Sequence, residues 1–265
     1  MRVRETAVAG EFYPASANEC EAIFSYYNEL LEKHMDKTLL KSKSKAVIVP
    51  HAGYIYSGFT ANIAYRILAN SGLKRIVVIG PSHRVYLLGS SVGDFDLFET
   101  PFGNLKYDSA FAKELMQKFN LKFFPDAHFE HSTEVQMPFI KKYMDAEVVE
   151  VVYGDENPTN LVPVIEYALK RDSTGVVIST DLSHFYDINR AKQLDSICID
   201  AVVKLDPDEL HKGCEACGKI GMQAMIMAAS NLGLKPLLLD YRTSADVSGD
   251  SLQVVGYLSV AFNHS

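Results

Sequence analysis

The stretch AVIVPHAGYIYSG, residues 46–58, decides the fold because a buried strand ends there on a histidine. The four consecutive apolar residues 46–49 are typical of a strand that is covered on both faces of a sheet. Pro50 interrupts the run, and His51 follows it directly. Tyr54 lies in the glycine-containing turn that comes next, where it is predicted to line a pocket and contact a substrate. We therefore expect the carboxyl end of this strand to deliver functional side chains.

Two further apolar runs follow the same plan. RIVVIGPSH, residues 75–83, ends on His83, and GVVISTDLSH, residues 175–184, ends on His184. Ligands of open α/β sheets bind in the crevice outside the carboxyl ends of the strands. If the three strands are parallel neighbours, about 4.8 Å apart, three imidazoles converge there and can share one metal ion. The alternative is that each histidine is only a polar residue at a strand end.

Short apolar runs alternate with helical patterns along the rest of the chain, which indicates an α/β fold. We expect a single domain over residues 1–265, with a mostly parallel central sheet flanked by helices. The last two strands, 235–244 and 252–262, are expected to pair antiparallel, and 90–108 to form a hairpin at a sheet edge. The other expected strands are 46–50, 75–83, 146–154 and 175–184, and the expected helices are 17–35, 57–72, 109–120, 132–144, 158–171, 188–205 and 219–233.

Composition and charge exclude some function classes. The chain has a net charge of −7, and its one basic cluster is the short stretch KSKSK, residues 41–45, so nucleic acid is not an expected partner. The first residues lack the apolar region of a signal peptide. No apolar run approaches the roughly 18 residues of a membrane span. We therefore expect a cytoplasmic protein that does not insert into membranes.

Two stretches contribute further candidates for the crevice. Asp181 precedes His184 by three residues and is expected either to orient an imidazole or to stabilise a turn. In HFEHSTEVQMPF, residues 128–139, His131 and Glu134 lie on one side of a helix start, where both are candidate substrate contacts. His128 is expected to be solvated. The spacing is not HExxH, so this stretch does not predict a zincin.

The four cysteines are Cys20, Cys198, Cys214 and Cys217. A cytosolic chain of this length does not need disulfides to fold. Cys214 and Cys217 form one CxxC pair, which is too small for a zinc ribbon and stays a redox or ligand candidate. Cys217 precedes a helix, whose N-terminus is expected to lower the thiol pKa, although a small buried residue is the alternative. Gly218 is expected to permit a close backbone approach.

The motifs AGEFYP, VPHAGYIYSG, IGPSH, TPFGNL, EHSTEVQMPF, STDLSH, CG and VVGYLSVAF together resemble the Memo family in order and spacing. Its archaeal and bacterial members are also called AmmeMemoRadiSam system protein B, and its fold resembles LigB-type class III extradiol dioxygenases with non-haem iron. The resemblance implies that His51, His83 and Cys217 are metal ligands and that His184 is a nearby base. It also implies that Asp181 and His131 lie in the pocket. Gln136 departs from relatives that have histidine there.

We expect one of several functions from these features. The first is a non-haem iron or copper redox enzyme, in which His184 and Asp181 are catalytic. The second is a non-catalytic module that binds a small molecule or peptide in the same crevice. The third is a zinc hydrolase, in which His184 acts as a base toward a metal-bound water. The family's second name also suggests AMMECR-like and radical SAM proteins as partners.

Overall fold

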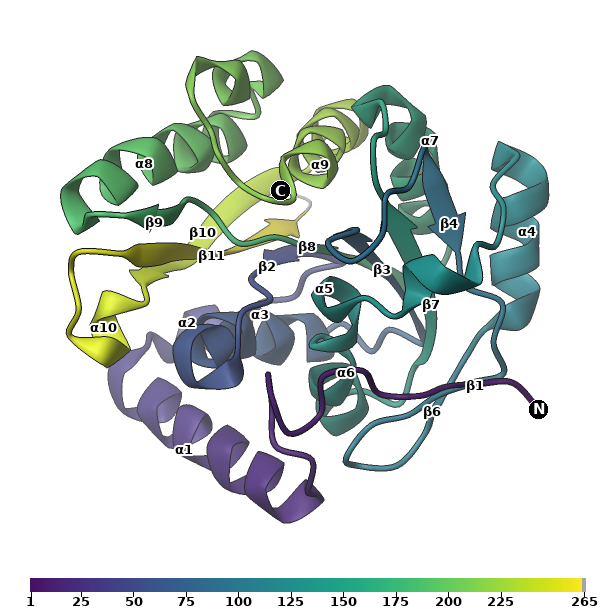
Figure 1. The fold of residues 1–265 in the computed structure, drawn as a ribbon, viewed down its shortest axis with the longest axis horizontal. Helices are drawn as coiled ribbons and strands as arrows, with labels where there is room; N and C mark the ends of the chain where they lie inside the picture. Colours follow the sequence, from purple (N-terminus) through teal and green to yellow (C-terminus); the bar gives the residue numbers. More distant parts are fainter. Residues whose placement is uncertain (264–265) are drawn as a thin grey trace.

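The computed structural model describes residues 1–263, and its centre is an eight-stranded sheet with the order β10-β11-β2-β8-β3-β7-β4, in which β9 also pairs with β11 (Figure 1). The strands of this sheet are β2 (Ala46–Val49), β3 (Arg75–Pro81), β4 (Ser90–Val92), β7 (Glu147–Tyr153), β8 (Thr174–Ser179), β9 (His184–Tyr186), β10 (Lys235–Thr243) and β11 (Val254–Asn263). The α/β class with a mixed, centrally parallel sheet is as predicted. The sequence also predicts a surface position for His264, but this residue lies outside the described residues.

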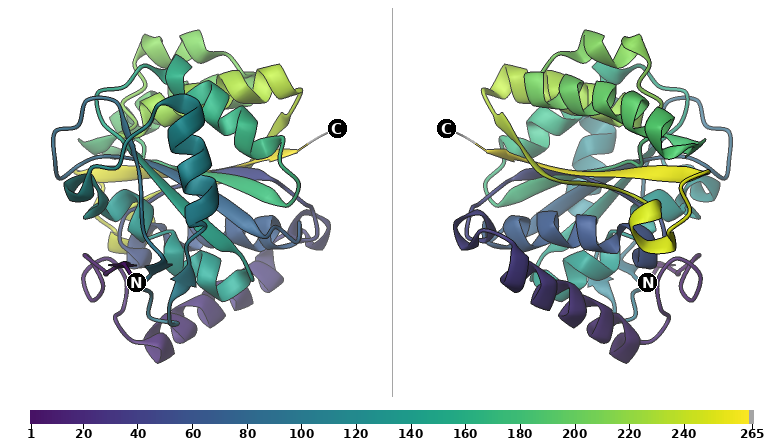
Figure 2. Two further views of the ribbon diagram at one scale, coloured as in Figure 1. Left: turned by 90° about the vertical axis from the view of Figure 1, so that its right-hand side faces the viewer. Right: turned by 90° about the vertical axis from the view of Figure 1, so that its left-hand side faces the viewer.

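Helices cover both faces of the sheet (Figures 1 and 2). On one face lie α7 (Pro158–Leu169), α8 (Ile188–Lys204) and α9 (Lys219–Leu232), together with the short η3 (Pro207–Lys212). The other face carries α1 (Ala17–His34), α2 (Lys37–Leu40), α3 (Phe59–Ala69), α5 (His131–Glu134) and α6 (Met137–Tyr143). The helix α4 (Ser109–Phe119) packs near the β4 and β7 edge, and η2 (Pro125–His128) and α10 (Ala245–Ser248) are short turns.

The strands β2, β8 and β3 are parallel neighbours at the centre of the sheet. Val49 pairs with Ser179 between β2 and β8, and Ile79 pairs with Ile178 between β3 and β8. Every residue of β2 and β8 is buried, which explains why their sequences are apolar runs without alternation. The prediction that these three strands are parallel neighbours is therefore confirmed.

The edges of the sheet differ partly from expectation. The strands β10 and β11 pair antiparallel, as predicted. Residues 90–108, however, do not form one hairpin at the edge. Only β4 joins the main sheet, antiparallel to β7, while β5 (Leu97–Phe98) and β6 (Leu105–Lys106) form a separate small sheet with β1 (Val3–Arg4). The reason is that β5 pairs with β1, whose residues lie 94 positions earlier in the sequence, and no local pattern indicates such a pairing.

Two predicted helices begin or divide differently. The helix expected over 57–72 starts with a π-helical turn, Tyr54–Gly58, and continues as α3. The helix expected over 132–144 is split into α5 and α6, which meet at Val135 and Gln136. Pro138 lies in the first turn of α6, and its missing N–H cannot donate to the carbonyl of Glu134 in a continuous helix.

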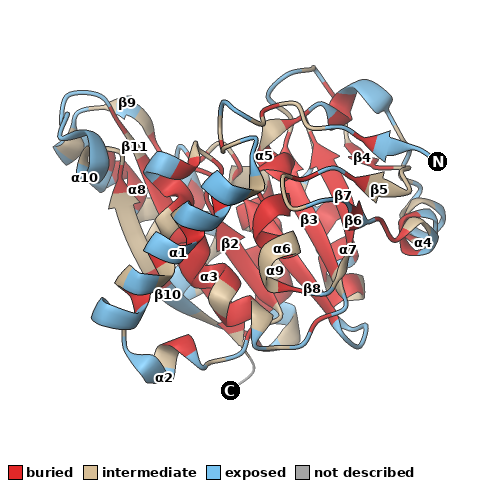
Figure 3. Cartoon of the chain, turned by 90° about the horizontal axis from the view of Figure 1, so that it is seen from below, coloured by how far each residue is buried: buried red, intermediate tan, exposed pale blue. Residues whose placement is uncertain are grey.

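The buried residues are concentrated in the sheet and on the helix faces that contact it, as Figure 3 shows in red. This continuous core fixes the strand ends that carry the candidate side chains, because close-packed interiors leave little room for shifts. Among residues 1–263, the helices are too short or too polar for any of them to cross a bilayer.

Candidate metal centre

Three histidines meet at the carboxyl ends of the central strands. His51 follows β2, His83 follows β3, and His131 begins α5. One ligand nitrogen from each lies within 4.8 Å of the other two. The ring centroids are 5.1 Å apart for His51 and His83, and 4.6 Å apart for His83 and His131. This spacing suits one metal ion bound between the rings.

The third imidazole of this cluster is His131 and not His184, which corrects the sequence expectation. His184 is separated from the end of β8 by four residues and begins β9, where it pairs with Val255 of β11 and is partly exposed. It still lies close enough for its charge to lower the pKa of His51 and of Asp181. His184 therefore lies near the cluster without belonging to it, and it is partly exposed.

Glu130 holds two of the three rings. Its Oε1 lies 3.0 Å from Nδ1 of His83 and 3.0 Å from Nδ1 of His131. The same carboxylate accepts the backbone N–H groups of His83, at 2.6 Å, and of Ser132, at 3.0 Å. An ionised carboxylate can only accept hydrogen bonds, so both Nδ1 atoms carry protons. Both Nε2 atoms are thus left with lone pairs for a metal.

Glu130 is ionised despite its burial. Desolvation alone would raise the pKa of this carboxyl group, but the hydrogen bonds from His131, His83 and Ser132 hold its pKa well below its usual range. The negative charge lies behind the rings, on the side away from their free nitrogens. It therefore increases the basicity of both imidazoles as ligands.

His51 is the most buried of the three rings, with 2% of its surface exposed. Its backbone N–H donates to Oδ1 of Asp181 at 2.8 Å, and its Nδ1 lies 2.9 Å from Oγ of Ser179. Burial, together with the nearby charges of His83 and His131, places the pKa of His51 well below its usual value. His51 is therefore neutral, which is the form that binds metals.

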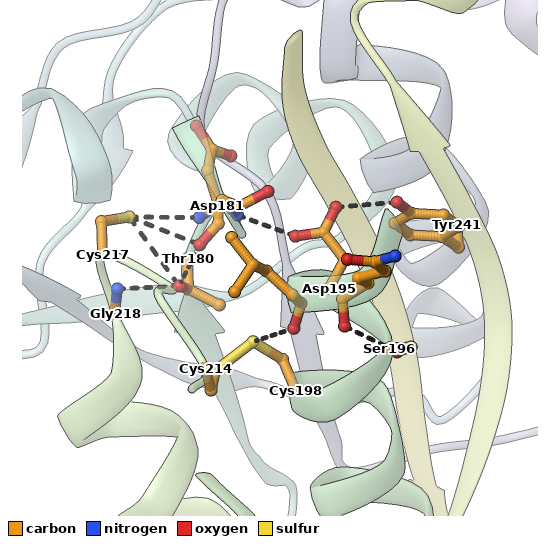
Figure 4. Close-up of a disulfide and its surroundings, with 12 residues drawn as sticks. Thr180, Asp181, Asp195, Ser196, Cys198, Cys214, Cys217, Gly218 and Tyr241 are labelled. Atoms are coloured by element: carbon orange, nitrogen blue, oxygen red, sulfur yellow. Dashed lines mark hydrogen bonds between the residues drawn. A yellow bond between two sulfur atoms is a disulfide. The ribbon is translucent and has the colours of Figure 1, made fainter. Parts of the chain in front are cut away.

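Cys217 adjoins the cluster on the side of His51. Its Sγ lies 3.2 Å from Nε2 of His51. It also accepts the backbone N–H of Asp181 at 3.3 Å (Figure 4). Among the described residues, the group whose ligand atoms all lie within 4.8 Å comprises the three histidines without Cys217. The sulfur thus faces one ligand nitrogen and is a candidate additional ligand.

The expected low pKa of the Cys217 thiol is wrong for the metal-free protein. Burial, and then the charge of Asp181, raise its pKa to about 12. The helix that follows starts only at Lys219, so its N-terminus does not outweigh the desolvation. Gly218 does permit the predicted close approach, because a Cβ there would lie 2.5 Å from Cβ of Thr180.

The CxxC pair is divided between two roles. Cys214 forms a disulfide with Cys198 of α8, while Cys217 and Cys20 are free (Figure 4). This was not expected from the sequence, because Cys198 lies 16 residues before its partner. The disulfide ties η3 and the loop after it to α8, and that loop carries Cys217 to the crevice.

Asp181 lies beside His51. Its Oδ2 lies 4.0 Å from Nε2 of His51, while Oδ1 accepts the backbone N–H of the same residue. Burial raises the pKa of Asp181, although the hydrogen bond from His51 opposes that rise. Asp181 therefore holds the backbone of a candidate ligand and borders its free nitrogen.

The polar groups of two expected substrate contacts, Glu134 and Tyr54, are bonded to other parts of the chain. The carboxylate of Glu134 is buried and is fully used by Arg4, Tyr13 and the N–H groups of Ala7 and Val8. The hydroxyl of Tyr54 donates to the carbonyl of Val135 at 2.7 Å within the aromatic core. Both polar groups are therefore engaged in hydrogen bonds within the protein.

His128 is buried, which contradicts the expectation that it is solvated. Its Nδ1 lies 2.6 Å from Glu150, and its Nε2 lies 2.7 Å from Oγ of Ser91. Glu150 also accepts a hydrogen bond from Thr133 of α5. This network connects the β4 and β7 edge to the segment that carries His131.

Sequence reasoning missed Glu130 and Ser179 as parts of the centre. Each has a signal in hindsight: Glu130 directly precedes His131, and Ser179 ends the apolar run of β8. Neither signal is specific, because an acidic residue before a short helix is also an ordinary N-cap. Glu130 in fact has that role as well, since it caps α5.

A family model described as Memo-like protein matches residues 4–261. The chain belongs to this Memo-like family. A MEMO1 family protein of Aquifex aeolicus is 34% identical over 276 residues, covering 99% of this chain and 100% of the relative. One from Archaeoglobus fulgidus is 34% identical over 275 residues, with 98% and 99% covered. Family membership therefore extends over the whole fold that holds the histidine cluster.

Proposed function

We propose that this protein binds a redox-active transition metal, iron or copper, between His51, His83 and His131, with Cys217 as an additional ligand. The observation that carries the proposal is the orientation of His83 and His131, whose Nδ1 atoms are both committed to Glu130. Imidazole and thiolate donors suit iron, copper and zinc and disfavour magnesium and calcium. The donor set therefore fits the metal.

A bound iron or copper ion would supply electron transfer or activation of O₂ for a small substrate. The residues of the chain supply the rest. Glu130 keeps the rings of His83 and His131 aligned, and Asp181 fixes the backbone of His51. His184, which is partly exposed near the cluster, is the group that moves protons between the crevice and solvent. The class of substrate is a small molecule or peptide that enters from that side.

Metal analysis after anaerobic purification tests the proposal. We expect about one iron or copper ion per chain in the wild type and a large loss in His83→Ala. His211→Ala is the matched control, because His211 is an exposed histidine outside the cluster. Cys217→Ser is expected to change the optical or EPR spectrum, whereas Cys20→Ser, at a buried free cysteine, is not. A protein that stays metal-free with micromolar Fe(II), Cu and Zn would exclude a metal function.

Zinc-dependent hydrolysis is the second candidate, favoured by the three-histidine donor set that catalytic zinc sites use with a bound water. His184 would then take the proton from that water. Oxygen consumption that depends on an added substrate would support the redox function. Hydrolytic turnover with zinc, without oxygen consumption, would support the hydrolase.

A further inference from the structure

A chain of buried hydrogen bonds leads from α3 to the centre. The hydroxyl of Tyr65 donates to Oε1 of Gln136 at 3.0 Å. The amide nitrogen of Gln136 donates to the carbonyl of Pro50 at 2.9 Å and to Oγ of Ser179 at 2.9 Å. The carbonyl of Pro50 can only accept, so it fixes which end of the amide is the nitrogen. Ser179 therefore accepts from Gln136.

The hydroxyl proton of Ser179 also has a fixed acceptor. Its hydroxyl donates to the carbonyl of Ser132 at 2.5 Å, and this oxygen again can only accept. A serine hydroxyl has one proton and two lone pairs. The proton of Ser179 is donated to the carbonyl of Ser132, and one lone pair accepts the hydrogen bond from Gln136. The contact with Nδ1 of His51, at 2.9 Å, therefore uses the second lone pair.

We propose that Ser179 is a positioning residue that locks His51 in the tautomer with its proton on Nδ1. The direction of every bond in the chain follows from the two backbone carbonyls. Nε2 of His51 is then left with its lone pair, facing Cys217 at 3.2 Å. All three rings of the cluster then have Nε2 as the unprotonated nitrogen. Glu130 fixes the proton on Nδ1 of His83 and His131, and Ser179 fixes it on Nδ1 of His51.

The sheet register makes this arrangement possible. Ser179 is the last residue of β8 and pairs with Val49, the last residue of β2, so it lies beside the chain that leads to His51. Ser179 and Gln136 are fully buried, and water therefore does not compete for these bonds. An alanine at 179 would leave Nδ1 of His51 without its acceptor, and the ring would lose the cause of its tautomer preference.

Nitrogen-15 NMR of the imidazole rings in metal-free protein tests the tautomer directly. In the wild type, the His51 signals, assigned by their absence in His51→Ala, are expected to show a proton on Nδ1 and none on Nε2. A proton on Nε2 of His51 would overturn the proposal without any variant. Ser179→Ala is expected to mix the two tautomers, while Ser179→Thr, which keeps the hydroxyl, restores the wild-type pattern.

The consequence for metal binding rests on the proposed function and is measured separately. Ser179→Ala is expected to weaken the binding of added Fe(II) or Zn(II) by about 10- to 100-fold. Ser44→Ala is the matched control, because Ser44 is also a buried, hydrogen-bonded serine but lies before the start of β2, at the opposite end from His51. It is expected to leave metal affinity and the His51 signals unchanged. Weaker binding with an unchanged tautomer would refute the role of Ser179. A correct tautomer in a protein that binds no metal would instead refute the proposed function.

Discussion

Replacing Glu130 by glutamine tests the centre at the side chain that contacts most of its other parts. The wild-type carboxylate accepts four N–H groups, two from the rings of His83 and His131 and two from the backbone. A glutamine offers one oxygen, and its NH₂ group must face at least one of those donors. One buried N–H left unpaired costs about 1–3 kcal/mol of unfolding free energy. A ring can avoid this only by moving its proton to Nε2, which removes a ligand lone pair.

We therefore expect Glu130→Gln to lower stability by about 1–3 kcal/mol and metal affinity by about 10- to 100-fold. Urea denaturation of metal-free protein measures the first quantity, and competitive titration with Zn(II) or Fe(II) measures the second. Glu134→Gln is the control, because Glu134 lies in the same turn, is equally buried and accepts several donors, none of them from the histidines. It should lose stability and keep its metal affinity. Equal affinities in Glu130→Gln and the wild type would refute the assigned role.

Other predictions concern the surroundings of the centre. Reduction of the Cys198–Cys214 disulfide should lower the free energy of unfolding by about 3 kcal/mol, given a loop of this size, in denaturation with and without dithiothreitol. The pKa of Glu150 is lowered in the folded protein, because its hydrogen bonds and ion pair outweigh burial. Ionised Glu150 therefore stabilises the folded protein above its unfolded pKa of about 4.5, and this contribution is lost as the pH falls through the lower folded pKa. The free energy of unfolding of Glu150→Gln should accordingly fall less steeply with decreasing pH than that of the wild type. Equal slopes for the two proteins would contradict this. Gly218→Ala, whose Cβ would lie 2.5 Å from Thr180, should cost about 1–3 kcal/mol and weaken metal binding; unchanged denaturation midpoints would show that the loop yields freely.

The sequence predicted the parts of this protein that depend on local pattern and on known rules of sheet topology. Apolar runs ending on His51 and His83 predicted strands buried on both faces, and the carboxyl-end rule placed the two rings together. The helix boundaries agree within a few residues, apart from the π-helical start of α3 and the break between α5 and α6. The pairing of β10 with β11 was also predicted. These features follow from burial, periodicity and chain connectivity.

The sequence by itself thus determined which strand ends supply His51 and His83, while it was the family resemblance that pointed to Cys217 near the cluster. Only the tertiary structure decided the third ring, because His131 enters from α5 across the crevice while His184 is drawn into pairing with β11. It also decided that Cys214 pairs with Cys198, and that the N–H groups of the rings are directed by Glu130 and Ser179. The physical reason is that hydrogen-bond direction, burial and sulfur pairing depend on groups far apart in sequence, whose approach is set by packing and not by local pattern.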